Sequence, residues 1–171
     1  MRDLLESDIR RAFSGVMLGP GVSLRQAAVI DRYGEGVTEE EFRELPNSEV
    51  TDDWANVPWE ELERDNVAHL DPEGWRYYIP AFMLSVLESY DPISMRVVGT
   101  LASLNPDDHL GEYHLPRYNL LTYEQKQVIA RYLEALPQLV PLTDVDLPIV
   151  RSGLEMYWRN YLPLIVVEGP K

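Results

Sequence analysis

The stretch from Asp71 to Tyr90 constrains the fold most, because it combines the start signals of a helix with a long apolar pattern. Asp71 is a favourable N-cap, and Pro72 suits the first helical position because an N–H there has no partner within the helix. Glu73 favours the positive end of the helix dipole. The apolar residues recur at spacings of three and four: Trp75, Tyr78, Ile79, Phe82, Met83, Val86, Leu87 and Tyr90. The pattern predicts a long helix with one wide buried face, around which the other elements pack.

Pro80 lies in the middle of this expected helix. Its missing N–H removes the hydrogen bond to the carbonyl oxygen of Arg76, so we expect a bend there. The bend can be architectural or functional, and the sequence leaves both readings open. An aromatic stripe at helical spacing is more typical of a hydrophobic core than of a ligand platform.

Other segments predict further helices on both sides of the central one. Capping boxes at Ser23, Thr38 and Thr122 mark three starts, because each hydroxyl residue precedes Gln or Glu by three positions. The predicted helices cover residues 4–13, 24–33, 39–45, 59–64, 91–105, 123–136 and 148–161. The helix after residue 90 is expected to bury Ile93, Val97, Leu101 and Leu104. The fold class predicted is mainly α: a single compact helical domain over 1–171 with about six to eight helices and at most a short strand at 164–167.

The central helix carries a distinctive run of residues: Asp71-Pro72-Glu73-Gly74-Trp75-Arg76-Tyr77-Tyr78-Ile79-Pro80-Ala81-Phe82-Met83. This run resembles the hallmark of a bacterial family of domains of unknown function, in which Leu is commoner at the position of Ile79. Two flanking pieces are similar to that family as well: Asp53-Trp54 with Val57-Pro58, and Leu121-Thr122-Tyr123-Glu124-Gln125 with Val128-Ile129. The resemblance covers about residues 52–136 and implies no particular activity, cofactor or partner.

Acidic residues are concentrated in the segment 35–65. It holds twelve carboxylates against Arg43 and Arg64, and so supplies ten units of the net charge of −14. Such a surface argues against nucleic acid or an anionic membrane as a direct partner, since both need cationic protein surface. The segment is either a solvated surface or a face that binds a partner. Trp54 and Trp59 are expected to anchor it to the core, although exposed tryptophans there would mark a binding surface.

Cysteine and leader patterns bear on the compartment. The chain has no cysteine, which excludes disulfides, thiolate metal sites and a cysteine nucleophile. The first residues are charged and lack a signal-peptide core, and no apolar run reaches the length of a membrane span. We therefore expect a soluble protein of the cytoplasm.

Residues 105–121 form the longest stretch without clear periodicity, and we expect a long loop there. His109, Glu112 and His114 lie in it and offer a mixed nitrogen and oxygen metal site, or acid–base groups for hydrolysis. Their spacing matches neither His-Glu-x-x-His on a helix nor a calcium-binding EF-hand loop. A polar surface loop that happens to contain histidines is the competing reading.

Two functional hypotheses follow from these features. The first is a non-enzymatic acidic protein that docks a basic protein, most concretely a toxin-neutralising immunity-type inhibitor. The alternative is a metal-assisted or acid–base enzyme that uses His109, Glu112 and His114. Neither a Gly-x-Ser-x-Gly elbow nor a phosphate-binding Gly-Lys-Ser/Thr motif is present, so the first hypothesis is preferred and no cofactor is expected. Its partner-binding residues are predicted to be Glu39, Glu40, Glu44, Asp52, Asp53, Glu60 and Glu61. The oligomeric state is left open.

Overall fold

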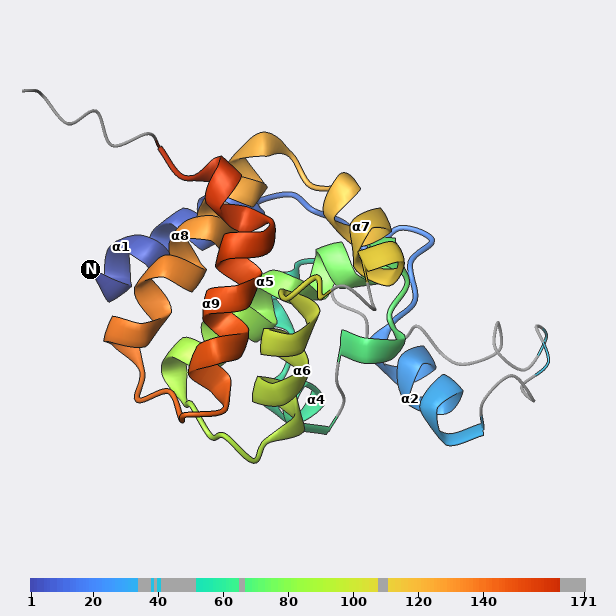
Figure 1. Ribbon diagram of the computed structural model, residues 1–171. Coiled ribbons are helices and arrows are strands. Elements are labelled where there is room, and N and C mark those ends of the chain that lie inside the picture. The colour runs from blue at the N-terminus through green and yellow to red at the C-terminus, as the bar shows by residue number, and fades with distance from the viewer. Residues whose placement is uncertain (34–37, 39, 41–51, 65–66, 108–110, 164–171) are drawn as a thin grey trace, which may run out of the picture.

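The computed structural model describes residues 1–33, 38, 40, 52–64, 67–107 and 111–163. Over these ranges the chain forms eight α-helices and three short 3-10 helices (η) and no strand, which confirms the predicted mainly α fold class (Figure 1). In chain order they are α1 (Arg2–Ala12), α2 (Leu24–Tyr33), η3 (Trp54–Asn56), α4 (Trp59–Arg64), η4 (Val67–His69), α5 (Pro72–Glu88), α6 (Met95–Ser103), α7 (Gly111–Asn119), α8 (Tyr123–Leu139), α9 (Asp146–Met156) and η5 (Trp158–Tyr161). The predicted strand at 164–167 and residues 41–45 of the predicted acidic helix lie outside the described residues.

Asp71 caps α5 as predicted, and it also fixes a distant part of the chain. Its Oδ1 accepts a hydrogen bond from the N–H of Gly74 at 2.9 Å and another from the N–H of Val22 at 2.8 Å. A Cβ at Gly74 would lie 2.3 Å from the carbonyl oxygen of Val22. Glycine is therefore needed in the first turn of α5, where the segment before α2 crosses it.

Helix α5 is buried on nearly every side, and not on one face as the apolar stripe predicts. Tyr77, Pro80, Ala81 and Ser85 lie off that stripe and are buried as well. The helix contacts α1, η3, α4, η4, α6 and α7, which together enclose it. An α-helix that is apolar all round is typical of such a central position.

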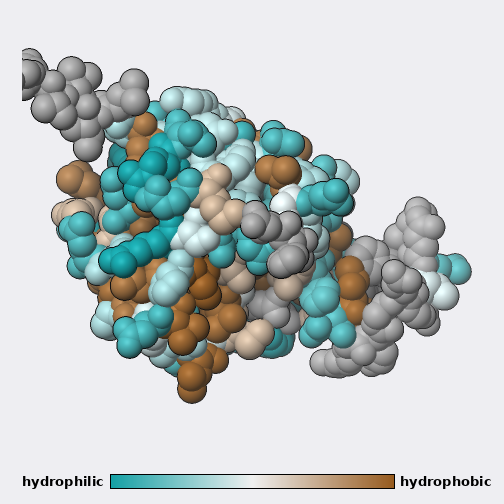
Figure 2. All heavy atoms as spheres, viewed as in Figure 1, coloured by the Kyte–Doolittle hydropathy of each residue, from teal (hydrophilic) through white to brown (hydrophobic). Residues whose placement is uncertain are grey.

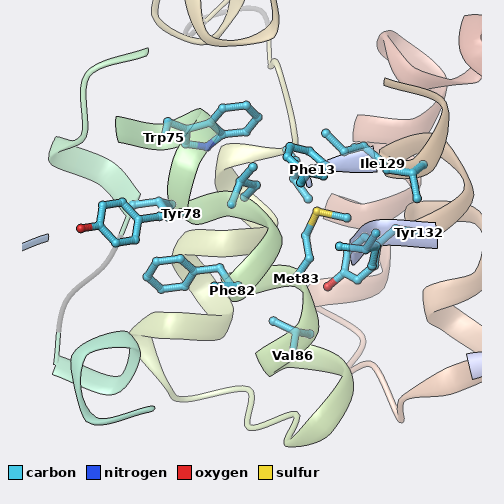
Figure 3. Packing of buried hydrophobic residues seen from close by; sticks show 14 of the residues in the cluster. Phe13, Trp75, Tyr78, Phe82, Met83, Val86, Ile129 and Tyr132 are labelled. Carbon is cyan, nitrogen blue, oxygen red and sulfur yellow. The ribbon is translucent and has the colours of Figure 1, made fainter. Parts of the chain in front are cut away.

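The core is built outward from α5 in two directions. Figure 3 shows Tyr78 and Phe82 on one side of the helix and Met83 on the other, facing Phe13 of the α1 end and Ile129 and Tyr132 of α8. Helices α1 and α8 also pack against each other. Segments from both ends of the sequence therefore meet over the central helix.

The start of α6 differs from the prediction. Asp91 Oδ1 accepts a hydrogen bond from the N–H of Ile93 at 3.1 Å, so Asp91-Pro92 makes a turn, and the helix begins after its N-cap, Ser94. Ile93 is 86% exposed, which makes its predicted burial wrong. The rest of that predicted stripe is confirmed, because Val97, Leu101 and Leu104 are buried.

The C-terminal helices follow the prediction closely. The Thr122 capping box is confirmed: Thr122 N–H donates to Gln125 Oε1 at 3.0 Å, and Gln125 N–H donates to Thr122 Oγ1 at 3.2 Å. Helix α8 continues two residues past Pro137, which lies in its last turn and does not end it. The predicted last helix is divided at Tyr157 into α9 and η5. Among the described helices, none has both the length and the apolar character that crossing a bilayer requires.

Candidate functional site

A groove of about 300 Å³ opens where α1, η3, α4 and α5 meet. Most of its described lining residues are apolar or aromatic and three are polar, while polar and apolar atoms contribute about equally to its surface. The described lining residues are Arg10, Trp54, Ala55, Val57, Trp59, Leu62, Ala81, Leu84, Ser85 and Glu88. We call this the tryptophan groove.

Trp54 is held in place from two sides. Its indole Nε1–H donates a hydrogen bond of 2.8 Å to the carbonyl oxygen of Phe13, which fixes η3 against the end of α1. Asp53 caps η3, because its Oδ1 accepts a hydrogen bond from the N–H of Ala55 at 2.9 Å. Trp54 is buried, as expected of an anchor, and it is also one of the residues that line the groove.

Trp59 forms another wall and is half-buried. The guanidinium of Arg96 lies over its ring, 4.6 Å from the centroid. Arg96 in turn donates to Glu63 Oε1 at 2.7 Å, to Ser85 Oγ at 3.0 Å and to the carbonyl oxygen of Ser89 at 2.6 Å. These contacts tie α4, α5 and α6 together behind the groove and hold the Trp59 ring by a cation–π contact.

A second cavity of about 370 Å³ adjoins the tryptophan groove and shares Arg10, Trp54 and Ala55 with it. Asp52 and Asp53 line this cavity, together with residues 14–16. Among the described lining residues of both cavities, Arg10 is the one cation, against the carboxylates of Asp52, Asp53 and Glu88. The combined site is therefore an aromatic hollow with an acidic excess.

Several predicted partner-binding carboxylates lie at or next to this site. Asp52 and Asp53 are exposed in the second cavity, and Glu60 and Glu61 occupy the first turn of α4 beside Trp59. Glu40 is exposed but is not among the residues lining either cavity. Glu39 and Glu44 lie outside the described residues.

Sequence reasoning missed Glu88. It is exposed at the C-terminal end of α5 and lines the tryptophan groove. The sequence does carry a signal, since Glu88 is an acidic residue at the negative, C-terminal end of a mainly apolar helix, where a carboxylate is unfavourable.

The predicted loop 105–121 is wrong, because residues 111–119 form α7. Within that helix Glu112 is exposed and His114 is 3% exposed. Residues two apart on a helix do not share a face, so the structure does not bring Glu112 and His114 together. His109 lies outside the described residues. Among the described residues, no three His, Asp or Glu side chains are grouped closely enough to hold a metal ion.

His114 instead lies on the buried face of α7, together with Arg117 and Tyr118. Its ring stacks on Tyr118 at a centroid distance of 5.9 Å, and neither ring nitrogen has a hydrogen-bond partner among the described residues. Burial, and then the charge of Arg117, lowers the pKa of His114, against an opposing effect of Asp107. Arg117 donates to the carbonyl oxygens of Leu70 at 2.6 Å and Ala68 at 3.0 Å, so α7 is joined to the segment before α5.

No curated protein and no solved structure matches the chain. A family model described as a family of unknown function (DUF6714) matches residues 1–162. The match extends beyond the central motif in both directions, from the start of α1 to the residue after η5. The chain thus belongs to the DUF6714 family.

Proposed function

We propose that this protein is a non-enzymatic binding protein of the bacterial cytoplasm, and that its acidic segment docks a basic protein. The most concrete form is a toxin-neutralising immunity-type inhibitor whose partner is a cationic toxin. The observation that carries the proposal is the position of Asp52, Asp53, Glu60 and Glu88 at or beside an aromatic hollow. The lack of cysteine suits a reducing compartment.

The tryptophan groove fits the chemistry of an arginine or lysine side chain. Such a side chain buries its methylene stem against apolar surface and keeps its charged head near water. In the groove the stem would lie against Trp54, Trp59 and Leu84, and the head would reach Glu88 at the edge. Arginine adds planar stacking on aromatic rings and paired hydrogen bonds to a carboxylate, so it suits the site better than lysine.

The charge around the groove supports fast capture of such a partner. The whole chain carries a net charge of −14, and most of it comes from the segment that includes Asp52, Asp53, Glu60 and Glu61. A concentrated acidic surface raises the rate at which a cationic protein encounters it. Added salt screens this attraction and lowers the rate again. Rapid capture is the property that an inhibitor of a toxic protein needs.

Affinity capture from extract of the source cell tests the proposal. At low salt the tagged protein is expected to retain a basic protein, identified by mass spectrometry, and to release it as salt rises. The double variant Asp52→Lys, Glu60→Lys should lose this protein while keeping its helical circular dichroism, because both side chains are exposed. Neither carboxylate caps a described helix, unlike Asp53.

A matched control separates local from total charge. Glu134→Lys with Asp144→Lys changes the net charge equally at exposed positions on α8 and before α9, away from the groove. The control is expected to retain the captured protein. Capture that survives the groove-side reversal would mean that the acidic segment is only a solvated surface.

A further inference from the structure

The polarity of α6 is inverted relative to an ordinary surface helix. Every residue of Met95–Ser103 is described, and its one charged side chain, Arg96, is 1% exposed. The outward positions are Met95, Val98 and Ala102, which recur at spacings of three and four and therefore form one stripe. A surface helix normally turns its charged face to water and its apolar face to the core.

The inversion has two parts, a buried cation and an exposed apolar stripe. The contacts of Arg96 explain only the buried cation. Its bonds to Glu63, Ser85 and Ser89 need a cation inside the molecule, at the junction of α4, α5 and α6. They place no requirement on the opposite face of α6, where any polar side chain would be accommodated by water. The apolar stripe outside is therefore a separate feature of the sequence.

The stripe continues into a larger apolar surface. Ile93 is 86% exposed just before α6, Met95 is 58% exposed, and Val145 at the start of the neighbouring α9 is 71% exposed. The hydroxyl of Tyr90 donates a hydrogen bond to Asp146 and accepts one from the N–H of Thr143 at 3.1 Å. These bonds hold the segment before α6 against the start of α9. Figure 2 shows hydrophobic residues gathered over α6, the segment before it and the adjacent end of α9. We call Ile93, Met95, Val98, Ala102 and Val145 the α6 patch. A contiguous exposed apolar patch commonly marks an interaction site.

We propose that the α6 patch is the contact surface between two copies of this chain, related by a two-fold axis. A two-fold interface sets the same patch against itself, so it must be self-complementary. Each copy carries a net charge of −14, and surfaces rich in carboxylates repel their own copies. The α6 patch itself is uncharged and apolar and therefore meets this requirement, while Asp91 and Asp144 are exposed outside it, in the segments that precede α6 and α9.

The small residues of the stripe favour the same occupant. Ala102 is exposed and Gly99 is half-exposed on α6, and neither carries a side chain beyond Cβ. Two α6 helices can therefore approach closely, with Met95 and Val98 of each filling the space beside the other. The apolar character matches that of homodimer interfaces, which are richer in nonpolar surface than transient complexes between different proteins.

Salt separates this contact from the capture of a basic protein. Screening reduces the repulsion between two strongly acidic copies, so self-association should strengthen as salt rises. Capture at the tryptophan groove should weaken over the same range. Because self-association and the capture of a basic protein depend on salt in opposite directions, an experiment can contradict one of these proposals and leave the other standing.

Analytical ultracentrifugation of the full chain over a range of concentrations, at low and high salt, tests the inference. The wild type should form a dimer whose population increases with concentration and with salt. Val98→Glu should weaken association by about tenfold or more, because each dimer would then bury two unpaired carboxylates. Leu4→Glu is the matched control, since Leu4 is an aliphatic side chain 72% exposed on α1.

The absence of cysteine gives a second measurement that does not depend on a destabilising change. Val98→Cys and Leu4→Cys each introduce the one thiol of the molecule. Under mild oxidation, Val98→Cys should give a disulfide-linked dimer much faster than Leu4→Cys. Helical circular dichroism checks that each variant is folded.

The outcomes decide the inference in both directions. A monomer at every concentration and salt, with equal cross-linking of the two cysteine variants, would overturn it. Dimerisation that Val98→Glu leaves unchanged would place the contact on another face and overturn it as well. Concentration-dependent dimers that Val98→Glu disrupts and Leu4→Glu preserves would support it.

Discussion

The indole N–H of Trp54 donates a 2.8 Å hydrogen bond to the carbonyl oxygen of Phe13, the C-cap residue of α1. This bond joins two segments 41 positions apart and sets one wall of the tryptophan groove. The acidic segment is thereby attached to the core at Trp54, and the two residues before it, Asp52 and Asp53, are exposed to solvent.

Trp54→Phe should lower the free energy of unfolding by about 1–2 kcal/mol. It removes the hydrogen bond and part of the ring, while the carbonyl oxygen of Phe13 keeps its bond from the N–H of Val16. Denaturant unfolding measures the change. A variant as stable as the wild type would show that the bond contributes nothing to holding η3.

Trp75→Ala should lower the free energy of unfolding by about 3–5 kcal/mol, because Trp75 is fully buried beside Tyr118 and truncation leaves a cavity. Trp75→Phe is the matched comparison. The indole N–H of Trp75 has no hydrogen-bond partner among the described residues, so its loss should matter little. Melting of the alanine variant near the wild-type temperature would place Trp75 at the surface, against the structure.

Arg96→Ala should lower the free energy of unfolding by about 2–4 kcal/mol, since it empties a buried position and leaves the carbonyl oxygen of Ser89 and the hydroxyl of Ser85 without this donor. Glu63→Ala leaves the buried guanidinium without its carboxylate, but Glu63 is 40% exposed and water can replace it, so the loss of stability should be smaller, about 1–2 kcal/mol. Chemical denaturation of both variants gives the comparison. Equal losses would show that the ion pair, and not the buried bonds, dominates.

Stability should fall as pH drops below about 6.5, the usual pKa of an unfolded histidine, because the pKa of His114 is lower in the folded protein. Below that pH the unfolded chain binds a proton at His114 and the folded chain does not, which favours unfolding. The free energy of unfolding therefore continues to fall until the pH reaches the pKa of His114 in the folded protein. His114→Phe keeps the stacking on Tyr118 and should flatten that part of the pH profile. Identical profiles for the wild type and His114→Phe would contradict the burial of a neutral imidazole.

The features that the sequence predicts well are local ones. Asp71, Ser23 and Thr122 cap their helices through bonds to residues three positions on, so the pattern and the structure share one cause. The apolar stripe of α5 likewise marks a long buried helix. That α5 is buried all round depends on its neighbours, which no stripe within the helix reveals.

Helix α7 was missed because its buried face is polar. The residues that it turns inward are His114, Arg117 and Tyr118, which a search for apolar periodicity does not register. Pro116 also lies inside it and removes the hydrogen bond to the carbonyl oxygen of Glu112. In and just before α6 the opposite happens, since Val98 in the helix and Ile93 in the turn before it are apolar and exposed.

The candidate site was predictable only in part for a similar reason. The acidic composition around Asp52 and Glu60 is visible in the sequence, and so is the presence of Trp54 and Trp59. The groove itself needs Arg10 from α1 and Glu88 from α5, which reach it only through the tertiary packing. Sequence spacing carries no information about such a meeting of four elements.

Binding of a labelled oligoarginine peptide, followed by fluorescence anisotropy as salt is varied, tests the central claim most directly. The peptide stands for the basic partner, and its affinity should fall steadily with salt. Three variants are compared with the wild type: the groove-side reversal Asp52→Lys with Glu60→Lys, the control reversal Glu134→Lys with Asp144→Lys, and Leu84→Trp, which fills the groove at unchanged charge. The account predicts that the first and third weaken binding by at least about tenfold and that the control has a much smaller effect. Equal weakening by the two reversals, with no effect of Leu84→Trp, would contradict it, because the peptide would then respond only to net charge.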